Sequence, residues 1–418
     1  MTATNCKYKD EAWDFTQADT KEYTHCLHNY PAMMVPQIAR ELLNRYGTPN
    51  GWALDPYCGT GTSLVEASMF GMNSIGCDIN PLVRLIAAAK TTPIALQVLE
   101  RALKDLNNAI FQVEFFGTVP PTPIPNVLNL DYWFSKEVTK CLSFLRNFIN
   151  AVEDEAVRNF LWVAFSETVR ECSYTRNGEF KLHRMPAQKM ASFHPDVFGI
   201  FQSKLVRNQR GFEAYLKKRK DVDIFISDKN TANCEPPEHR PSKGFDLIIT
   251  SPPYGDSQTT VAYGQYSRLS ADWIGLPDSR TVDRLSMGGR KKASRLCDSP
   301  VNSAITEIRS VDDKRARQVE AFYIDLERSI NSVVPLLAKH STICYVVGNR
   351  RVKGVTLPTD EFIIFAFGKH GFLHKETIVR NIPNKRMPKK TSPSNIVGET
   401  DITMHEENIV ICQRLCDN

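Results

Sequence analysis

The sequence predicts an α/β protein with a doubly wound, Rossmann-like sheet and a largely helical insertion. Residues 52–78 contain a strand, a glycine-rich turn, a helix and a second strand that ends at an acidic residue. Apolar strands alternate with helical patterns again after residue 221, whereas residues 91–220 show mostly helical spacing of apolar residues. One sheet interrupted by an insertion explains this order better than three independent domains.

The first half of the chain contains the opening unit and the insertion. A helix that ends at Gly47 is expected before the first strand. The insertion is expected to hold four helical stretches, the last of them rich in lysine and arginine. The expected ranges are helices at 31–47, 63–70, 96–116, 136–152, 156–170 and 204–220, and strands at 52–54 and 73–76.

The second half is expected to resume the sheet, because its apolar runs are bounded by polar or turn residues. The expected ranges are strands at 223–227, 245–250, 343–347, 373–379 and 408–414, and helices at 313–339 and 359–369. Residues 255–311 are polar, basic and irregular, so a long loop is expected there. The predicted division is a catalytic domain of residues 1–90 and 221–418, with residues 91–220 inserted.

The composition excludes several classes of protein. With 418 residues, 42% of them hydrophobic and 24% charged, the chain can bury a core, which excludes global disorder. Eleven cysteines without a Cys-x-x-Cys pair argue against a disulfide scaffold and a structural zinc site. No segment reads as a secretory signal or a membrane span. We therefore expect a cytoplasmic protein with reduced thiols and no metal site.

A cofactor loop is predicted where residues 55–62, DPYCGTGT, join the first strand to the next helix. Glycines there let the backbone approach a ligand closely, and the helix start presents free N–H groups. Asp78 follows Gly59 by 19 residues, where an acid can bond the hydroxyls of an adenosine ribose. The third glycine of a dinucleotide motif and the lysine of a P-loop are both missing. An acid before the turn suits the cationic amino acid end of S-adenosylmethionine.

A second motif, Ser251-Pro252-Pro253-Tyr254, directly follows an apolar strand. Two prolines lack N–H donors and cannot extend a sheet, so they hold their carbonyl groups in a rigid turn. That turn lies at the carboxyl edge of the sheet, where ligands bind in α/β proteins. Alone, the motif fits a simple strand-ending turn; after a cofactor loop, it indicates a catalytic site.

Together the two motifs resemble those of the S-adenosylmethionine-dependent amino-methyltransferases of DNA, whose sheet is the class I methyltransferase form. The serine at the first position resembles the cytosine-N4 branch, since adenine-N6 enzymes usually carry Asp or Asn there. The resemblance covers most of residues 25–90 and 223–418. One departure is Tyr57-Cys58, where phenylalanine is common in the family.

The resemblance implies a set of site residues. The implied catalytic residues are Ser251, Pro252, Pro253 and Tyr254. The implied cofactor-binding residues are Tyr30, Pro31, Asp55, Pro56, Cys58, Gly59, Gly61, Thr62, Asp78, Ile79 and Asp228. Ser251 and the Pro252 carbonyl would hold the target amine, Tyr254 would stack on the base, and Asp228 would contact the adenine amine of the cofactor.

The implied activity is transfer of a methyl group from S-adenosylmethionine to the N4 amine of cytosine in duplex DNA, after base flipping. The expected setting is a type II restriction–modification system with a cognate endonuclease, and a monomer is expected. The alternatives are an adenine-N6 DNA methyltransferase, a less favoured RNA guanine-N2 methyltransferase, and a DNA-binding protein without catalytic activity.

Basic clusters give the prediction of a DNA partner. The net charge is only +5, but residues 204–220, 284–295 and 380–390 concentrate positive charge that can contact phosphates. The predicted DNA-binding residues are Arg284, Arg290, Lys291, Lys292, Lys385 and Arg386. Residues 255–311 are a candidate DNA clamp. The insertion is the candidate recognition region, through Arg170, Ser173, Arg176, Glu179, Lys181 and Arg184.

Overall fold

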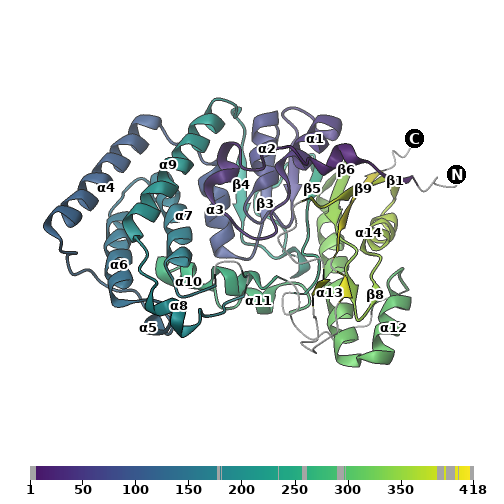
Figure 1. Cartoon of the computed structure of the whole chain (residues 1–418). Coiled ribbons are helices and arrows are strands. Elements are labelled where there is room, and N and C mark those ends of the chain that lie inside the picture. The colour runs from purple at the N-terminus through teal and green to yellow at the C-terminus, as the bar shows by residue number, and fades with distance from the viewer. Residues whose placement is uncertain are drawn as a thin grey trace.

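The computed structural model describes residues 6–414 with short gaps (Figure 1). The gaps are residues 177–178, 180, 234, 257–260, 290–295, 297, 384–389, 392–400 and 403, and only the backbone is described at 390–391 and 401–402.

One eight-stranded sheet forms the centre of the described structure, in the order β1-β9-β12-β6-β5-β2-β3-β4. Its strands are β1 (Lys7–Lys9), β2 (Trp52–Asp55), β3 (Asn73–Cys77), β4 (Ile224–Ser227), β5 (Phe245–Thr250), β6 (Leu337–Val347), β9 (Phe372–Asn381) and β12 (Glu406–Arg414). β12 runs antiparallel to β6 and β9, and the other pairs are parallel. The chain moves outward from β2 to β4 and then returns to β5. The strand order therefore reverses between β2 and β5, which is where doubly wound sheets bind ligands.

Helices cover both faces of this sheet. Because successive side chains of a strand point to opposite faces, each face has its own apolar core. Ile343 and Tyr345 of β6 pack toward α12 (Asn302–Val311), α13 (Asp313–Val333) and α14 (Thr359–Gly368). Cys344 and Val346 pack on the opposite face, toward α1 (Pro36–Tyr46) and α2 (Thr62–Phe70). The layered order confirms the Rossmann-like class.

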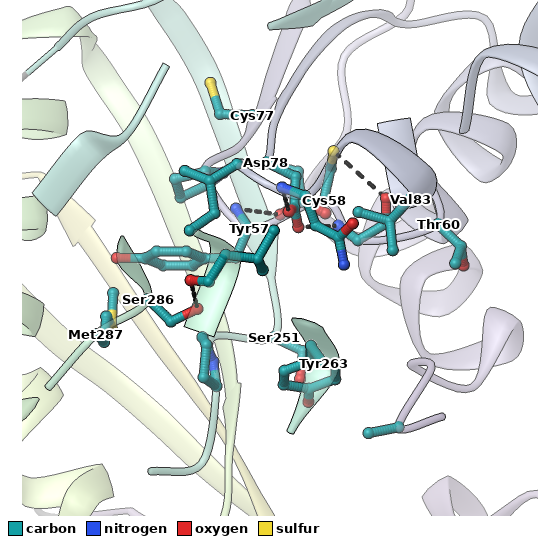
Figure 2. Close-up of a pocket in the computed structure, with 18 of the residues that line it drawn as sticks. Tyr57, Cys58, Thr60, Cys77, Asp78, Val83, Ser251, Tyr263, Ser286 and Met287 are labelled. Carbon is teal, nitrogen blue, oxygen red and sulfur yellow. Dashed lines mark hydrogen bonds between the residues drawn. The ribbon is translucent and has the colours of Figure 1, made fainter. Parts of the chain in front are cut away.

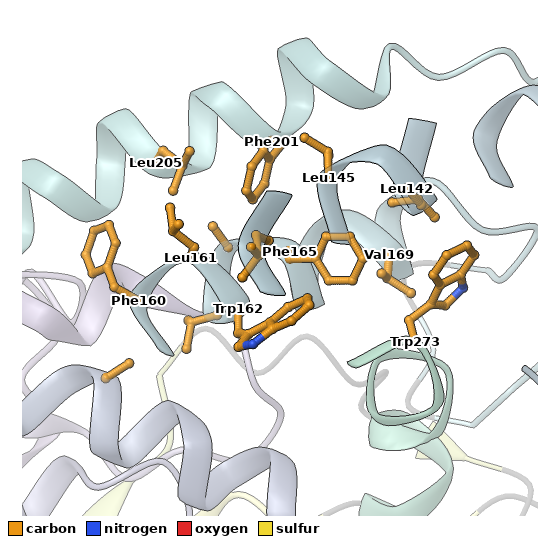
Figure 3. Packing of buried hydrophobic residues seen from close by; sticks show 14 of the residues in the cluster. Leu142, Leu145, Phe160, Leu161, Trp162, Phe165, Val169, Phe201, Leu205 and Trp273 are labelled. Atoms are coloured by element: carbon orange, nitrogen blue, oxygen red, sulfur yellow. The ribbon is translucent and has the colours of Figure 1, made fainter. Parts of the chain in front are cut away.

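A block of helices lies beside the β4 side of the sheet (Figure 1). It contains α3 (Pro81–Thr91), α4 (Leu96–Phe116), α5 (Leu130–Trp133), α6 (Lys136–Asn150), α7 (Glu155–Glu171), α8 (Ala187–Ala191) and α9 (Val197–Leu216). α7 lies at its centre, and Phe165 of α7 packs with Leu145, Phe201 and Trp273 in one apolar core (Figure 3). Trp273 belongs to α10 (Tyr263–Ile274), so the segment after the Ser251–Tyr254 turn shares this core.

The expectation of an irregular segment over residues 255–311 is wrong, because α10, α11 (Val282–Leu285) and α12 lie in it. Helix α10 escapes a search for apolar periodicity because its buried face includes Gly264, Ser267 and Ser270. The Ser270 hydroxyl donates to the Ser166 carbonyl oxygen of α7 at 2.7 Å, which satisfies that buried polar group.

Element boundaries also differ from the expected ones. The first helix begins at Pro36 rather than residue 31, since proline fits the first turn of a helix. The basic helix begins at Val197, where Asp196 caps it through the Gly199 N–H, and it ends at Leu216. The helix expected to reach residue 339 ends at Val333, and β6 begins at Leu337. Strand β1, parallel to β9, was not expected.

The remaining described elements are short. They are η1 (Glu11–Asp14), η2 (Tyr23–Leu27), η3 (Thr231–Asn233), η4 (Val334–Leu336), β7 (Arg351–Val352), β8 (Val355–Thr356), β10 (Lys390–Thr391) and β11 (Asp401–Ile402). Within the described part of the chain, every helix is too short or too polar to cross a bilayer.

Replacement of Phe165 by alanine tests the core of the helical block. Phe165 is fully buried, so Phe165→Ala should lower the free energy of unfolding by about 3–5 kcal/mol. Phe115→Ala is the matched control: its side chain is 72% exposed, and we expect a change below about 0.5 kcal/mol. Urea unfolding of both variants measures the difference; equal effects would contradict the assigned core.

Candidate active site

A cavity opens at the carboxyl ends of β2, β3 and β5, next to the point where the strand order reverses (Figure 2). It measures about 1010 Å³, including space that is open to solvent. Its lining residues are Tyr30, Pro31, Ala32, Met33, Met34, Asp55, Pro56, Tyr57, Cys58, Gly59, Thr60, Thr62, Cys77, Asp78, Ile79, Asn80, Val83, Lys229, Asn230, Thr231, Ser251, Pro253, Tyr263, Val282, Leu285, Ser286 and Met287.

The glycine loop between β2 and α2 needs its glycines for two different reasons. Gly59 and Gly61 have φ values of +49° and +77°, a region that side chains disfavour. A Cβ atom on Gly61 would also lie 2.9 Å from the Cβ of Ala87 in α3. Gly61 therefore lets α2 approach α3 and does not itself line the cavity, whereas Gly59 does. The Gly59 N–H donates to Asp78 Oδ2 at 3.1 Å, which joins the loop to the end of β3.

Asp55 is buried at the end of β2 and holds three neighbouring segments together. Its carboxylate accepts hydrogen bonds from the Tyr57 N–H at 3.1 Å, from Thr250 Oγ1 at 2.6 Å and from Ser63 Oγ. These donors are uncharged, and burial raises the pKa of Asp55 to about 6. Thr250 is the last residue of β5, so Asp55 also fixes the start of the Ser251 turn.

Asp78 is the second carboxylate on the cavity wall. It accepts from the Asn80 N–H at 2.8 Å as well as from Gly59, and burial raises its pKa to about 6. A buried carboxylate (Asp55) and a partly buried one (Asp78) on a cavity with apolar walls such as Ile79 and Val83 favour a ligand that carries positive charge, hydroxyl donors and an apolar ring. S-adenosylmethionine has all three features, so these residues fit it.

An aromatic wall of Tyr30, which the sequence predicted, and Tyr263, which it did not, completes the cavity. The rings of Tyr30 and Tyr263 lie nearly parallel, with centroids 6.2 Å apart. Asn80 Nδ2 donates to the Tyr30 hydroxyl at 3.0 Å and to Ser267 Oγ at 2.9 Å, which joins α3 to α10. Asn80 could have been found, because Asn before Pro81 is a helix-capping signal. No comparable sequence signal indicates Tyr263, because the sequence around it predicts an irregular segment.

The Ser-Pro-Pro-Tyr turn is only partly in the cavity. Ser251 and Pro253 line it, whereas Pro252 and Tyr254 do not belong to its described lining. Ser251 Oγ donates to the Tyr254 hydroxyl at 3.3 Å, and the Tyr254 hydroxyl donates to Glu407 Oε1 at 2.9 Å. The Tyr254 hydroxyl therefore points toward β12, and its stacking on a base stays a prediction.

Asp228 does not lie where the resemblance implied. Its side chain is 65% exposed and outside the described cavity lining. The next three residues line the cavity instead, and Asn230 Nδ2 donates to the Leu285 carbonyl oxygen at 3.2 Å. The turn after β4 therefore brings Lys229, Asn230 and Thr231 to the cavity wall. Sequence spacing missed this displacement.

The predicted DNA-contacting residues have different outcomes. Arg284 is exposed on α11, whose Val282 and Leu285 line the cavity. Arg290, Lys291, Lys292, Lys385 and Arg386 lie outside the described residues.

Among the recognition candidates, two are buried. Arg170 is held by Nη2 donation to the Glu179 carbonyl oxygen at 2.6 Å and packs on the Tyr266 ring. Ser173 is also buried, so neither side chain is available to DNA in this conformation. Arg176 and Lys181 are exposed, and Arg184 lies over the Tyr132 ring.

The raised pKa values of Asp55 and Asp78 predict pH-dependent cofactor affinity. A cationic ligand with hydroxyl donors binds the ionised carboxylates better, so affinity should be lost as pH falls through about 6. We expect S-adenosylmethionine to bind about tenfold more weakly at pH 5 than at pH 7 in calorimetry. Asp78→Asn should weaken binding at pH 7 and reduce this dependence, and constant affinity over pH 5–8 would argue against the assignment.

Comparisons with known proteins identify the family of this chain. A family model described as DNA methylase matches residues 2–88. Type II methyltransferase M.MvaI of Kocuria varians is 39% identical over 420 residues, which cover 95% of this chain and 92% of the relative. Type II methyltransferase M.BsoBI of Geobacillus stearothermophilus is 22% identical, over 75% of this chain and 63% of its own length.

A shorter match points to a different substrate class. A tRNA (guanine(10)-N2)-dimethyltransferase of Methanocaldococcus jannaschii is 44% identical over 52 residues, 12% of this chain and 15% of the relative. The match to M.MvaI, in contrast, extends over nearly the whole of both chains. The chain therefore belongs to the family of type II DNA methyltransferases, and its methyl donor is S-adenosylmethionine.

Proposed function

We propose that this enzyme methylates the N4 amine of cytosine in duplex DNA. The observation that carries the proposal is Ser251 on the cavity wall, at the position where adenine-N6 enzymes usually have Asp or Asn. Its hydroxyl offers a neutral acceptor beside the proposed cofactor site. A cytosine amine conjugated into its ring needs such an acceptor to free its lone pair for attack.

The proposed roles combine the family resemblance with the positions of Asp55, Asp78 and Ser251 on the cavity wall. Asp78 binds the ribose hydroxyls, while Asp55 attracts the cationic amino acid end. S-adenosylmethionine supplies an electrophilic methyl group. Ser251 Oγ and the Pro252 carbonyl accept hydrogen bonds from the target amine and orient its lone pair toward the methyl group. Tyr254 would support the base. As the new N–C bond forms, the methyl C–S bond of the donor would break, S-adenosylhomocysteine would leave, and the amine would release one proton to the solvent.

The DNA substrate is expected to bind across the face that carries the cavity mouth. The cavity lies at the end of buried strands, so the target base must leave the duplex to enter it. Arg284 lies on the outer side of the helix that lines the cavity and is placed to contact a phosphate near the flipped base. We propose that the helical insertion contributes to recognition of the DNA sequence, and that the enzyme acts as a monomer with a cognate restriction endonuclease.

Mass spectrometry of nucleosides tests the proposed target directly. Duplex DNA with many different sites is incubated with the protein and labelled S-adenosylmethionine, then digested. N4-methylcytosine is the expected product; N6-methyladenine without N4-methylcytosine would overturn the proposal. A parallel reaction with tRNA tests the alternative that the short similarity to the tRNA enzyme raises. Methylation of tRNA but not of DNA would overturn the proposal of a DNA substrate.

Ser251→Ala should lower kcat for DNA methylation at least about 100-fold, because it removes an acceptor that aligns the reacting amine. Tyr254→Ala should cause a comparable loss. The Kd for S-adenosylmethionine should stay within about twofold of the wild type in both variants. Ser310→Ala, at an exposed position on α12, is the control and should retain full activity. Wild-type kcat in Ser251→Ala would refute the assigned role.

Arg284→Ala should weaken DNA binding for all sequences and make it less sensitive to salt. Loss of one phosphate contact lowers the slope of log K against log salt concentration by about 0.9. Arg101→Ala, at an exposed position on α4, is the control, because α4 lies far from α11 (Figure 1). Equal salt-dependence slopes for wild type and Arg284→Ala in fluorescence titrations would show that Arg284 does not contact a phosphate.

A further inference from the structure

A chain of hydrogen bonds runs from the catalytic turn to residues at the two ends of the sequence. Ser251 donates to the Tyr254 hydroxyl, and Tyr254 donates to Glu407 on β12. The second oxygen of Glu407 pairs with Arg380 on β9. Four side chains from three separate segments therefore form one connected path beneath the cavity.

The end of this path is a fixed positive charge. The Arg380 side chain is only 1% exposed. It donates from Nε to the Trp13 carbonyl oxygen at 2.8 Å and from Nη2 to the Asp14 carbonyl oxygen at 3.1 Å. A guanidinium group only donates, so Glu407 accepts hydrogen bonds from both Arg380 and Tyr254. A carboxylate only accepts hydrogen bonds, so the direction of every bond along the path is set from this end.

Each hydroxyl in the path carries one hydrogen, so the direction of one hydrogen bond determines the direction of the next. Burial, with the nearby Glu407 carboxylate, raises the pKa of Tyr254 well above its usual range, so its hydroxyl keeps the proton. That proton points at Glu407, and the tyrosine oxygen accepts from Ser251. Ser251 then has only lone pairs left for the cavity that it lines.

We infer that Glu407 is a positioning residue that, through Tyr254, fixes Ser251 Oγ as a hydrogen-bond acceptor toward the target base. Such an acceptor receives an exocyclic amine, which is a donor, and disfavours a carbonyl oxygen or an unprotonated ring nitrogen at that point. The inference rests on the proposed function for the role of Ser251 alone. It holds for a cytosine amine and for an adenine amine.

Glu407→Gln tests the direction of the path while keeping the shape of the side chain. A glutamine amide can donate to the tyrosine oxygen, so the Tyr254 proton can turn to Ser251 and the Ser251 proton can turn to the cavity. We expect kcat to fall about tenfold or more, with the KM for DNA and the Kd for S-adenosylmethionine within about twofold of the wild type. Calorimetry gives the concentration of cofactor-binding sites in each sample, and the rate is divided by that concentration. A loss of folded protein is then not mistaken for a loss of catalysis.

A double-mutant cycle separates positioning from general destabilisation. Tyr254→Phe removes the hydroxyl and leaves the pair of Glu407 with Arg380 in place, so it remains informative if Glu407→Gln does not fold. Because both residues act through one hydroxyl, the double variant should be no slower than Tyr254→Phe alone. Glu406→Gln is the control: this neighbouring residue pairs with Lys9 at the surface, and wild-type kcat is expected.

Wild-type kcat in Glu407→Gln, or losses that multiply in the double variant, would overturn the inference. Equal losses in Glu406→Gln and Glu407→Gln would also overturn it, since the effect would then arise from β12 as a whole. The identity of the methylated base in wild-type reactions tests the proposed function separately. An amine product together with an unaffected Glu407→Gln would leave the proposed function intact and remove only the role of Glu407.

Discussion

The buried carboxylate of Asp55 is the contact on which the site depends. It ends β2, and its partners Ser63 and Thr250 belong to α2 and to the end of β5. The cofactor loop and the Ser251 turn are thereby fixed relative to each other, although about 190 residues separate them in the chain. Methyl transfer needs this rigidity, because a misplacement of about 1 Å between methyl group and amine costs orders of magnitude in rate. The described hydrogen-bond donors to Asp55 are all uncharged, and burial raises the pKa of its carboxyl group to about 6.

The helical block contributes to the same site through α10. Trp273 anchors this helix in the core around Phe165, while Tyr263 at its other end lines the cavity. Asn80 and the Tyr30 hydroxyl connect that helix to the start of α3. The aromatic wall of the cofactor cavity is thus positioned by packing within the block, and a change in that packing would be transmitted to the cofactor.

Local chemistry explains which parts of this structure the sequence reveals. The glycine loop, Asp78 and the Ser-Pro-Pro-Tyr turn were predicted because strand, glycine and proline signals act within a few residues. Asp228 was misplaced because the turn after β4 decides which side chain faces inward, and spacing does not determine that turn. Tyr263 and α10 were missed because small polar residues satisfied by α7 replace the usual apolar stripe. The pairing of Tyr254 with Glu407, 153 residues apart, follows only from the order of the strands.

The positions of charged residues in the sequence also do not reveal which of them are paired in the fold. Two cations of the basic stretch 204–220, a cluster that could contact phosphates or form a solvated helix face, have acidic partners instead: Lys204 pairs with Glu171, and Arg207 pairs with Glu167 at 2.5 Å. These cations face α7 and hold α9 in the block, so they are not available to phosphates in this conformation. The cavity carries charge of the opposite sign, with Asp55 buried and Asp78 partly buried on its wall, where a cationic cofactor fits. The reaction needs negative charge where the cationic methyl donor binds and positive charge where the anionic duplex binds. The carboxylates lie inside the cavity, and the exposed arginine of α11 lies outside it, so the two charges are separated in space.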